Sequence, residues 1–293
     1  MLNTNSNNSC GHIKAWAPRI TNNKFIRKLL YRRFFRGIFG IIGPKYIIYE
    51  INGCKYYCNL LDQGGVVHYF LKNNHYEPYI TKLMSEYTQS TGDVMDVGAN
   101  IGYFSILCSK NTNGKVYSME PEPTNYRDIV ENIRLNASNN ILPFNLAAGN
   151  LNEKINFYVN NKNSGDHRCS KLDDNLYKVI QVDMKRIDNV LTKEEFDNIR
   201  LIKIDVQGYE MKVCEGMAKY LKGSKDLKII SELEPKGMLK VGDEPAQYLQ
   251  FMQDNGFKIS IIDEEKRILI PASIEETISW SRKSQTSNIL FEK

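Results

Sequence analysis

Three stretches of the sequence join an apolar run to a polar turn that could bind a ligand. The first is DVMDVGANIG, residues 93–102, where glycines let the backbone approach a ligand closely. A helix that begins after such a turn presents free N–H groups and the positive end of its dipole to an anionic group, such as a carboxylate. The candidate ligand-binding residues in this turn are Asp96, Gly98, Asn100 and Gly102.

This turn differs from the dinucleotide fingerprint G-x-G-x-x-G. Its middle position is Asn100, a residue that still tolerates left-handed backbone angles. Pyrophosphate binding is therefore less expected here. Asp96, at the end of the apolar run, is well placed to accept a hydrogen bond from a ligand amine or from amides of the loop. The alternative is a purely structural link between a strand and a helix.

Carboxylates stand at the ends of three further apolar runs. Glu120 follows VYSM, Asp205 follows LIKI, and Glu232 lies in IISELEP. Ligands in open α/β sheets bind outside the carboxyl ends of the strands, so these side chains should face the same crevice as Asp96. Glu120 is placed to grip a ribose diol. Structural alternatives stay open: Glu120 and Asp205 could cap the helices that follow, and backbone amides could satisfy Glu232.

Short apolar runs that alternate with helical segments after residue 92 predict a mostly parallel sheet with helices on both faces. An inserted hairpin over the sheet edge is predicted from two β-like stretches, residues 153–159 and 177–182. The strands of the main sheet are predicted at residues 93–97, 115–119, 141–147, 201–205, 227–233, 257–262 and 287–291, with helices at 123–136 and from Tyr103 and Tyr209 onward.

The first part of the chain predicts an extension of the α/β domain. Residues 1–23 are rich in Asn and Ser and predict a disordered arm. Residues 24–91 predict a basic amphipathic helix over 24–43, a hairpin over 46–60 around Asn52-Gly53, and a helix over 77–88. The basic helix could dock on the α/β domain, residues 92–293, or lie in the plane of an anionic membrane.

Composition excludes several classes of protein. Residues 1–49 hold nine Lys or Arg and no acid, so the remaining chain has 30 basic against 34 acidic residues and is slightly acidic. A broad nucleic-acid-binding face is therefore not expected. The six cysteines have no spacing typical of zinc sites or disulfide frameworks. Without a long apolar run or a secretory signal, we expect a cytoplasmic protein whose membrane contact, if it has one, is peripheral.

The motifs DVGANIGYFS, MEPEP, NIRLNASNN, NLAAGN and LIKIDVQGYE resemble, in order and spacing, the FkbM-type family of methyltransferases that use S-adenosylmethionine (SAM). The match runs from about Tyr46 to the C-terminal TSNILFEK. The resemblance implies a class I Rossmann-like fold with seven strands, one of them antiparallel, and methyl transfer to an oxygen, commonly on a sugar or a natural product. It also implies SAM as the cofactor.

The resemblance carries over to particular residues. It implies that Asp96 and the Gly98, Asn100 and Gly102 turn surround the methionine part of SAM, that Glu120 binds the ribose, and that Asp205 lies at the edge of the active site. Gln207 stands where family members commonly have Glu, which favours a structural role for that turn. SGDHR, residues 164–168, resembles a motif found in part of the family and lies where a substrate loop could close.

Methylation of a hydroxyl requires an aligned acceptor, exclusion of water and a base. The candidate bases are His167 and Asp205, with Asp166 a weaker one, and no spacing of His and Asp compels a metal site. Asp166, Arg168 and Glu232 are the candidate contacts to the substrate. Solvent-exposed or structural roles remain the alternative for His167.

Two other functions are compatible with the same motifs. An RNA methyltransferase would use the cofactor site together with the basic N-terminal segment as an RNA-holding arm. A catalytically silent Rossmann-like binding module would be tethered to a membrane or a partner through residues 24–43. The intact cofactor motifs argue against the silent module, whereas little in the sequence supports RNA as the acceptor.

Overall fold

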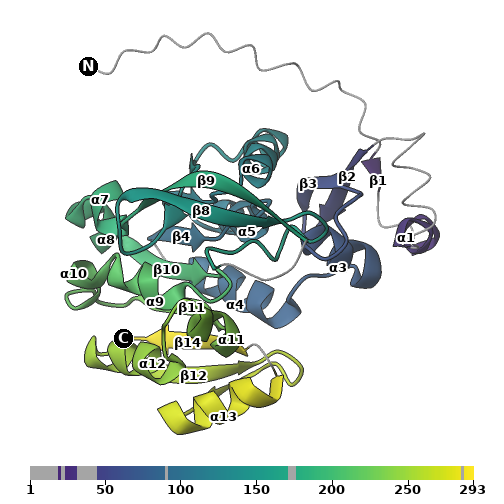
Figure 1. Ribbon diagram of the computed structural model, residues 1–293. Helices are drawn as coiled ribbons and strands as arrows, with labels where there is room; N and C mark the ends of the chain where they lie inside the picture. The colour runs from purple at the N-terminus through teal and green to yellow at the C-terminus, as the bar shows by residue number, and fades with distance from the viewer. Residues whose placement is uncertain (1–18, 21–23, 32–44, 90–91, 171–175, 285–286) are drawn as a thin grey trace, which may run out of the picture.

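The computed structural model describes residues 19–20, 24–31, 45–89, 92–170, 176–284 and 287–293. Its main sheet has eight strands in the order β13-β12-β14-β11-β10-β4-β5-β6 (Figure 1). β14 is antiparallel to β11 and to β12, and β13 is antiparallel to β12, whereas the other pairs are parallel. The strands are β4 (Asp93–Val97), β5 (Val116–Met119), β6 (Ile141–Phe144), β10 (Ile199–Ile204), β11 (Lys228–Leu233), β12 (Lys258–Asp263), β13 (Ile268–Pro271) and β14 (Ser287–Glu292).

The predicted α/β fold is confirmed, but the predicted number of strands is wrong by one. The added strand, β13, pairs with β12 in a hairpin at the edge of the sheet. It contains only three apolar residues before Pro271, a residue that an edge strand of a sheet tolerates. The predicted strand over 141–147 also divides, because β7 (Ala147–Ala148) leaves the main sheet to pair with β9.

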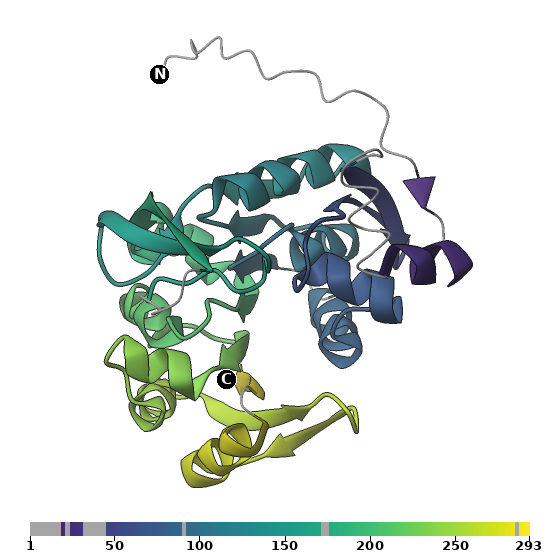
Figure 2. The ribbon, with the colours of Figure 1, turned by 45° about the vertical axis from the view of Figure 1, so that its right-hand side comes forward.

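Helices cover both faces of the sheet. They are α1 (Lys24–Tyr31), α3 (Val66–Asn73), α4 (Pro78–Thr88), α5 (Tyr103–Asn111), α6 (Pro123–Asn136), α7 (Ile187–Val190), α8 (Lys193–Asp197), α9 (Glu210–Glu215), α10 (Ala218–Leu221), α11 (Pro235–Lys240), α12 (Pro245–Asp254) and α13 (Ile274–Ser284). Figures 1 and 2 place α13 and the β12–β13 hairpin at the end of the molecule away from α6. α3 has no counterpart among the predicted elements.

Alternate residues of each central strand enter two different cores, because successive side chains of a strand point to opposite faces. Val94 and Leu201 pack with α4, α5 and the N-terminal extension. Met95 and Ile202 pack with the helices that follow β9 and β10. Both faces are buried, as expected for the parallel part of a sheet. Even-numbered residues of β4 and, after the register shift between Ile199 and Leu201, odd-numbered residues of β10 therefore share the face that α4 and α5 cover.

The predicted N-terminal hairpin is present as β2 (Tyr46–Ile51) and β3 (Cys54–Asn59). Asn52 and Gly53 both have positive φ, 51° and 67°, as a two-residue hairpin turn requires. The short strand β1 (Arg19–Ile20) pairs with β2. The hairpin and α3 pack into the same core as α4 and α5, so the extension shares its interior with the sheet.

The inserted hairpin is confirmed as β8 (Glu153–Asn160) and β9 (Tyr177–Lys185), which form a small sheet with β7. Figures 1 and 2 show this hairpin alongside the main sheet. The chain that leaves β8, residues 161–168, returns to pair Arg168 with Tyr158. We name residues 161–168 the post-β8 loop. It brings the SGDHR motif toward the carboxyl ends of the strands.

Only the first part of the predicted basic helix lies within the described residues. α1 packs against α3 and buries Leu30 in the core shared with the sheet, which agrees with docking for this segment. Residues 32–44, and the predicted arm except for β1, lie outside the described residues. Of the helices that the structure describes, none has the length and apolar character needed to cross a membrane.

Candidate active site

The carboxyl ends of β4, β5, β10 and β11 open into a cavity of about 360 Å³. This volume lies within the range of about 300–1,000 Å³ that is typical of small-molecule sites. The post-β8 loop and residues 64–77 close the cavity from other sides. Of the predicted site residues, those that line it are Asp96, Gly98, Asn100, Glu120, His167, Asp205 and Glu232.

The glycine turn after β4 is held tightly against the turn after β10. Gly98 has φ 81°, and a Cβ atom there would lie 1.9 Å from the backbone oxygen of Asp205. Only glycine fits this position. Asn100 also adopts a left-handed backbone, with φ 53°. Gly102 lies at the N-cap of α5 and packs against Ile129 rather than lining the cavity.

Glu120 holds the glycine turn from the neighbouring strand. Its Oε2 accepts a hydrogen bond from the backbone N–H of Asn100 at 2.9 Å, and its Oε1 accepts one from the N–H of Glu122 at 2.8 Å. Glu122, not Glu120, caps α6 by accepting from the N–H of Asn125. Burial raises the pKa of Glu120 to about 8, although these hydrogen bonds oppose the shift.

Asp96 lies at the end of β4 and is almost completely buried. Its Oδ2 accepts a hydrogen bond from the Ser105 hydroxyl at 2.5 Å, which connects the strand to α5. Burial raises the pKa of Asp96 to about 6, and the Ser105 hydrogen bond and the Lys203 cation oppose that rise.

Lys203 is a buried cation that sequence reasoning missed. Its side chain is 1% exposed, its Nζ lies 3.4 Å from Asp205 Oδ2, and β10 places it in register with Asp96. Burial alone would lower its pKa, but the surrounding carboxylates, with Asp205 and Glu77 the strongest, raise it. The signal was present in the sequence, because a lysine interrupts the otherwise apolar run LIKI.

Gln207 connects two carboxyl groups at the acidic side of the cavity. Its side-chain NH₂ donates to Asp205 Oδ1 at 3.0 Å and to Glu232 Oε2 at 2.7 Å. Burial opposes ionisation of Asp205, but Lys203 and Gln207 hold the pKa of Asp205 below its usual range. Burial and the Asp205 charge raise the pKa of Glu232 well above its usual value. Asp205 is thus the anion of this pair and Glu232 its protonated partner.

Asp205 does not cap the helix that follows it. α9 has no side-chain cap at its N-terminus, and the turn is closed by Glu210, whose Oε1 accepts from the N–H of Gly208 at 3.0 Å. The carboxylate of Asp205 is therefore left to face the cavity. Glu210 is completely buried. Sequence reasoning did not assign this structural role to it.

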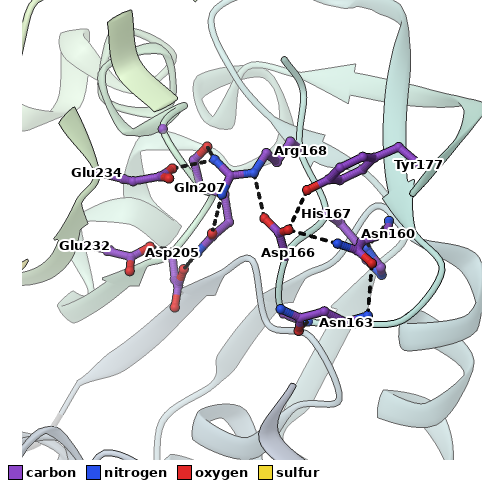
Figure 3. A network of polar contacts seen from close by, with 12 residues as sticks. Asn160, Asn163, Asp166, His167, Arg168, Tyr177, Asp205, Gln207, Glu232 and Glu234 are labelled. Atoms are coloured by element: carbon purple, nitrogen blue, oxygen red, sulfur yellow. Dashed lines mark hydrogen bonds and ion pairs between the residues drawn. The ribbon is translucent and has the colours of Figure 1, made fainter. Parts of the chain in front are cut away.

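Asp166 and Arg168 form an ion pair within the polar network that Figure 3 shows. Arg168 Nε donates to Asp166 Oδ1 at 2.6 Å, and its Nη1 donates to Glu234 Oε2 at 2.6 Å. Asp166 also accepts hydrogen bonds from the side chains of Asn160 and Tyr177. Neither residue lines the cavity, so both hold the post-β8 loop in place rather than face a ligand.

His167 lines the cavity with one ring nitrogen already engaged. Its Nδ1 accepts a hydrogen bond from the backbone N–H of Asn160 at 3.1 Å. Because a backbone amide can only donate, the neutral ring must carry its proton on Nε2. Burial lowers the pKa of His167, so this neutral form is favoured. In this form the remaining ring nitrogen, Nε2, is a hydrogen-bond donor and not a proton acceptor.

Ser164 joins the post-β8 loop to two other walls of the cavity. Its carbonyl oxygen accepts from Asn100 Nδ2 at 2.6 Å, and its N–H and hydroxyl donate to the two carboxylate oxygens of Asp62 at 3.0 and 2.7 Å. Sequence reasoning assigned neither Ser164 nor Asp62. Across the described ranges, no cluster of three or more His, Cys, Asp or Glu side chains is arranged to hold a metal ion.

The chain is similar in sequence to known methyltransferases. The family model of the methyltransferase FkbM domain matches residues 96–259. The hexuronic acid methyltransferase AglP of Haloferax volcanii is 25% identical over 171 residues, which cover 57% of this chain and 68% of that protein.

Two further similarities are more limited. A tRNA(Phe) (4-demethylwyosine(37)-C(7)) aminocarboxypropyltransferase of Methanocaldococcus jannaschii is 47% identical over 51 residues, 17% of this chain and 20% of that protein. Among solved structures, precorrin-6y C5,15-methyltransferase from Geobacter metallireducens aligns with a TM-score of 0.41 and 11% identity, over 73% of this chain and 87% of that one.

Proposed function

The chain belongs to the FkbM family of methyltransferases, and on this premise we propose that it methylates a hydroxyl oxygen of a sugar or glycan. SAM is the cofactor, and when bound it supplies a methyl group already activated on a positively charged sulfonium. The protein therefore has to hold SAM, orient the acceptor, exclude water and remove one proton. The acidic cavity at the strand ends is the observation that carries this proposal.

The cavity suits the charges of SAM. Its lining contains the carboxyl groups of Asp96, Glu120, Asp205, Glu232 and Glu77. A ligand with an ammonium and a sulfonium group would favour their ionised forms, because an opposite charge nearby stabilises a carboxylate. We assign the methionine part to Asp96 and the glycine turn, and the ribose to Glu120.

The side of the cavity formed by Asp205, Gln207 and Glu232, which we assign to the methyl acceptor, favours a neutral sugar. AglP, named as a hexuronic acid methyltransferase, supports a sugar acceptor. A carboxylate on that sugar would meet the anion of Asp205, whereas hydroxyl groups could donate to it. Gln207 and protonated Glu232 complete this polar side, and Tyr69 and Tyr76 add aromatic surface at the lining. Asp166 and Arg168 act through the post-β8 loop.

A transfer assay tests this proposal. The protein is incubated with SAM labelled in its methyl group and with methyl glycosides of glucose, galactose, mannose and glucuronic acid. We expect an alkali-stable methyl ether, with neutral glycosides at least about tenfold better than the glucuronide. Asp205→Asn should lower turnover strongly, whereas Asp197→Asn, an exposed aspartate of α8, should not change it.

Three results would contradict the proposal. A methyl group released by mild alkali would be an ester, formed on a carboxylate instead of a hydroxyl. Transfer to a tRNA transcript, with none to sugars, would make the enzyme an RNA methyltransferase. Bound SAM that transfers to no acceptor in a broad screen would favour the silent module.

A further inference from the structure

We propose that Glu77 is the general base of this site, the group that receives the proton of the acceptor hydroxyl. This inference rests on the proposed function, because only a hydroxyl acceptor has a proton to lose at the reacting oxygen. The sequence predicts Glu77 only as the first residue of a helix. Glu77 belongs to the N-terminal extension rather than to the motifs that follow the strands of the sheet.

The backbone at Glu77 is unusual. It has φ 39° and ψ 68°, a left-handed conformation that side chains other than Gly, Asn and Asp rarely adopt. Pro78 follows as the first residue of α4. Such conformations persist where the surrounding structure fixes them, and they gather at functional sites. Here the conformation directs the chain so that Glu77 lines the cavity.

The carboxylate of Glu77 is not used by its own helix. The first N–H groups of α4 are capped instead by Glu264, whose two carboxylate oxygens accept from the N–H of Tyr79 at 2.7 Å and of Ile80 at 3.2 Å. Oε2 of Glu77 is buried and accepts no hydrogen bond from the described residues. A buried acceptor without a donor is costly, so it points to a donor that arrives with a ligand.

The other carboxyl groups on the cavity wall each accept a hydrogen bond from the protein, Asp96 from the Ser105 hydroxyl. Glu120 accepts two backbone N–H groups, and Asp205 and Glu232 share the amide of Gln207. His167 presents a donor. Among the described residues that line the cavity, Glu77 is thus the carboxylate with a buried oxygen that no protein donor reaches.

The charges around Glu77 suit a base. Lys203 and Asp205 face it from β10, and Glu264 faces it from the β12–β13 turn. Burial raises the pKa of Glu77 to about 7, and Lys203 limits the rise. A base that titrates near neutral pH can both accept the proton and release it to water after each turnover.

Methyl transfer from SAM to the acceptor oxygen needs no further reactant. The acceptor oxygen forms a bond to the methyl carbon, and the bond from that carbon to sulfur breaks, leaving its electron pair on sulfur. The hydroxyl proton passes to the carboxylate of Glu77. The products are a methyl ether, S-adenosylhomocysteine and a protonated carboxyl group, which then loses its proton to solvent.

The test uses two variants of Glu77 and one matched control, all in the full chain. Glu77→Gln keeps the shape of the side chain, and Glu77→Asn removes the carboxylate while placing a residue that tolerates the left-handed backbone. Glu86→Gln makes the same change on the exposed side of α4. Each is assayed with the best neutral glycoside over pH 5.5–9, titrated with S-adenosylhomocysteine by calorimetry and unfolded thermally.

We expect both Glu77 variants to lower kcat by about 100-fold or more, the usual contribution of a positioned base. The wild-type rate should rise with pH through about 7, and this rise should be absent in Glu77→Gln. Affinity for S-adenosylhomocysteine should stay within about twofold. The Tm of Glu77→Asn should equal or exceed that of wild type, which a merely structural glutamate would not allow.

Different results overturn different claims. Retained turnover in Glu77→Gln, or a retained acidic limb, would overturn the assignment of Glu77 while the proposed function stands. A tenfold loss of S-adenosylhomocysteine affinity would place Glu77 at the cofactor instead. A wild-type protein that binds S-adenosylhomocysteine but methylates no glycoside would overturn the proposed function itself, without reference to the variants.

Discussion

His167 shows how a single hydrogen bond changes the chemistry that a residue can do. The sequence suggested a base, but the backbone N–H of Asn160 occupies Nδ1 and leaves the proton on Nε2. His167→Gln preserves a donor at the same wall. We expect kcat/KM to fall by no more than about tenfold, the scale of one hydrogen bond, and the pH profile to keep its shape. A 100-fold loss together with a lost acidic limb would restore His167 as the base.

Three of the site residues that the sequence predicted share one property. Asp96, Glu120 and Asp205 each lie at the carboxyl end of an apolar strand, and parallel strands bring these ends together. Lys203 and Glu77 were not predicted because their positions depend on distant parts of the chain. Lys203 meets Asp96 only through the register of β10 with β4, and Glu77 reaches the cavity only through a left-handed turn.

Helix α6 binds the edge of the N-terminal hairpin through two asparagines. Asn132 accepts from the N–H of Tyr57 and donates to the carbonyl of Ile101 at 2.8 Å. Asn136, one turn later, accepts from the N–H of Lys55 and donates to its carbonyl. These side chains replace the neighbouring strand that β3 lacks on this side.

The hydrogen bonds of Asn132 and Asn136 to β3, here called the asparagine clamp, predict that one substitution will lower the stability of the protein strongly. Asn132 is fully buried, so Asn132→Ala would leave an N–H and a carbonyl without partners. We expect the free energy of unfolding to fall by about 2–4 kcal/mol, measured by urea denaturation. Asn139→Ala, an exposed position after the same helix, should change it by less than about 0.5 kcal/mol. Equal effects in the two variants would show that the asparagine clamp contributes nothing.

The elements that the sequence did not predict are short. α3 has eight residues and begins after Gly64-Gly65, and β13 has four residues at the sheet edge. In contrast, the strands with a turn at their carboxyl end and the hairpin around Asn52-Gly53 were predicted within a few residues, because turn chemistry marks their ends. Short elements owe their structure to packing against the rest of the fold, which no local pattern records.

For the whole molecule, buried acids determine how stability depends on pH. Burial raises the pKa of Glu120 and of Glu210 to about 8, from an ordinary value near 4.5. The unfolded chain loses these protons above about pH 4.5, whereas the folded protein keeps them until about pH 8. Their contribution to stability is therefore complete below pH 4.5 and is lost as the pH rises through 8.

We accordingly expect the Tm of the ligand-free protein to fall between pH 6.5 and 8.5, by at least about 5 °C, since each linked proton is worth about 1.4 kcal/mol per pH unit. Burial lowers the pKa of His167, so this residue opposes the fall only at the lower end of the range, where the unfolded histidine still binds protons. Glu210→Gln should reduce the slope, because the amide does not ionise. A Tm that is constant or rises over the range would show that these acids are already ionised in the folded state.

Calorimetric titration with S-adenosylhomocysteine tests most directly whether this cavity binds the cofactor. We predict micromolar binding to the wild-type protein, at least about tenfold weaker binding to Glu120→Gln, and unchanged binding to Glu153→Gln, an exposed glutamate of β8. NAD should not bind. Absence of S-adenosylhomocysteine binding, or equal affinity in wild type and Glu120→Gln, would show that Glu120 and this cavity do not form the cofactor site.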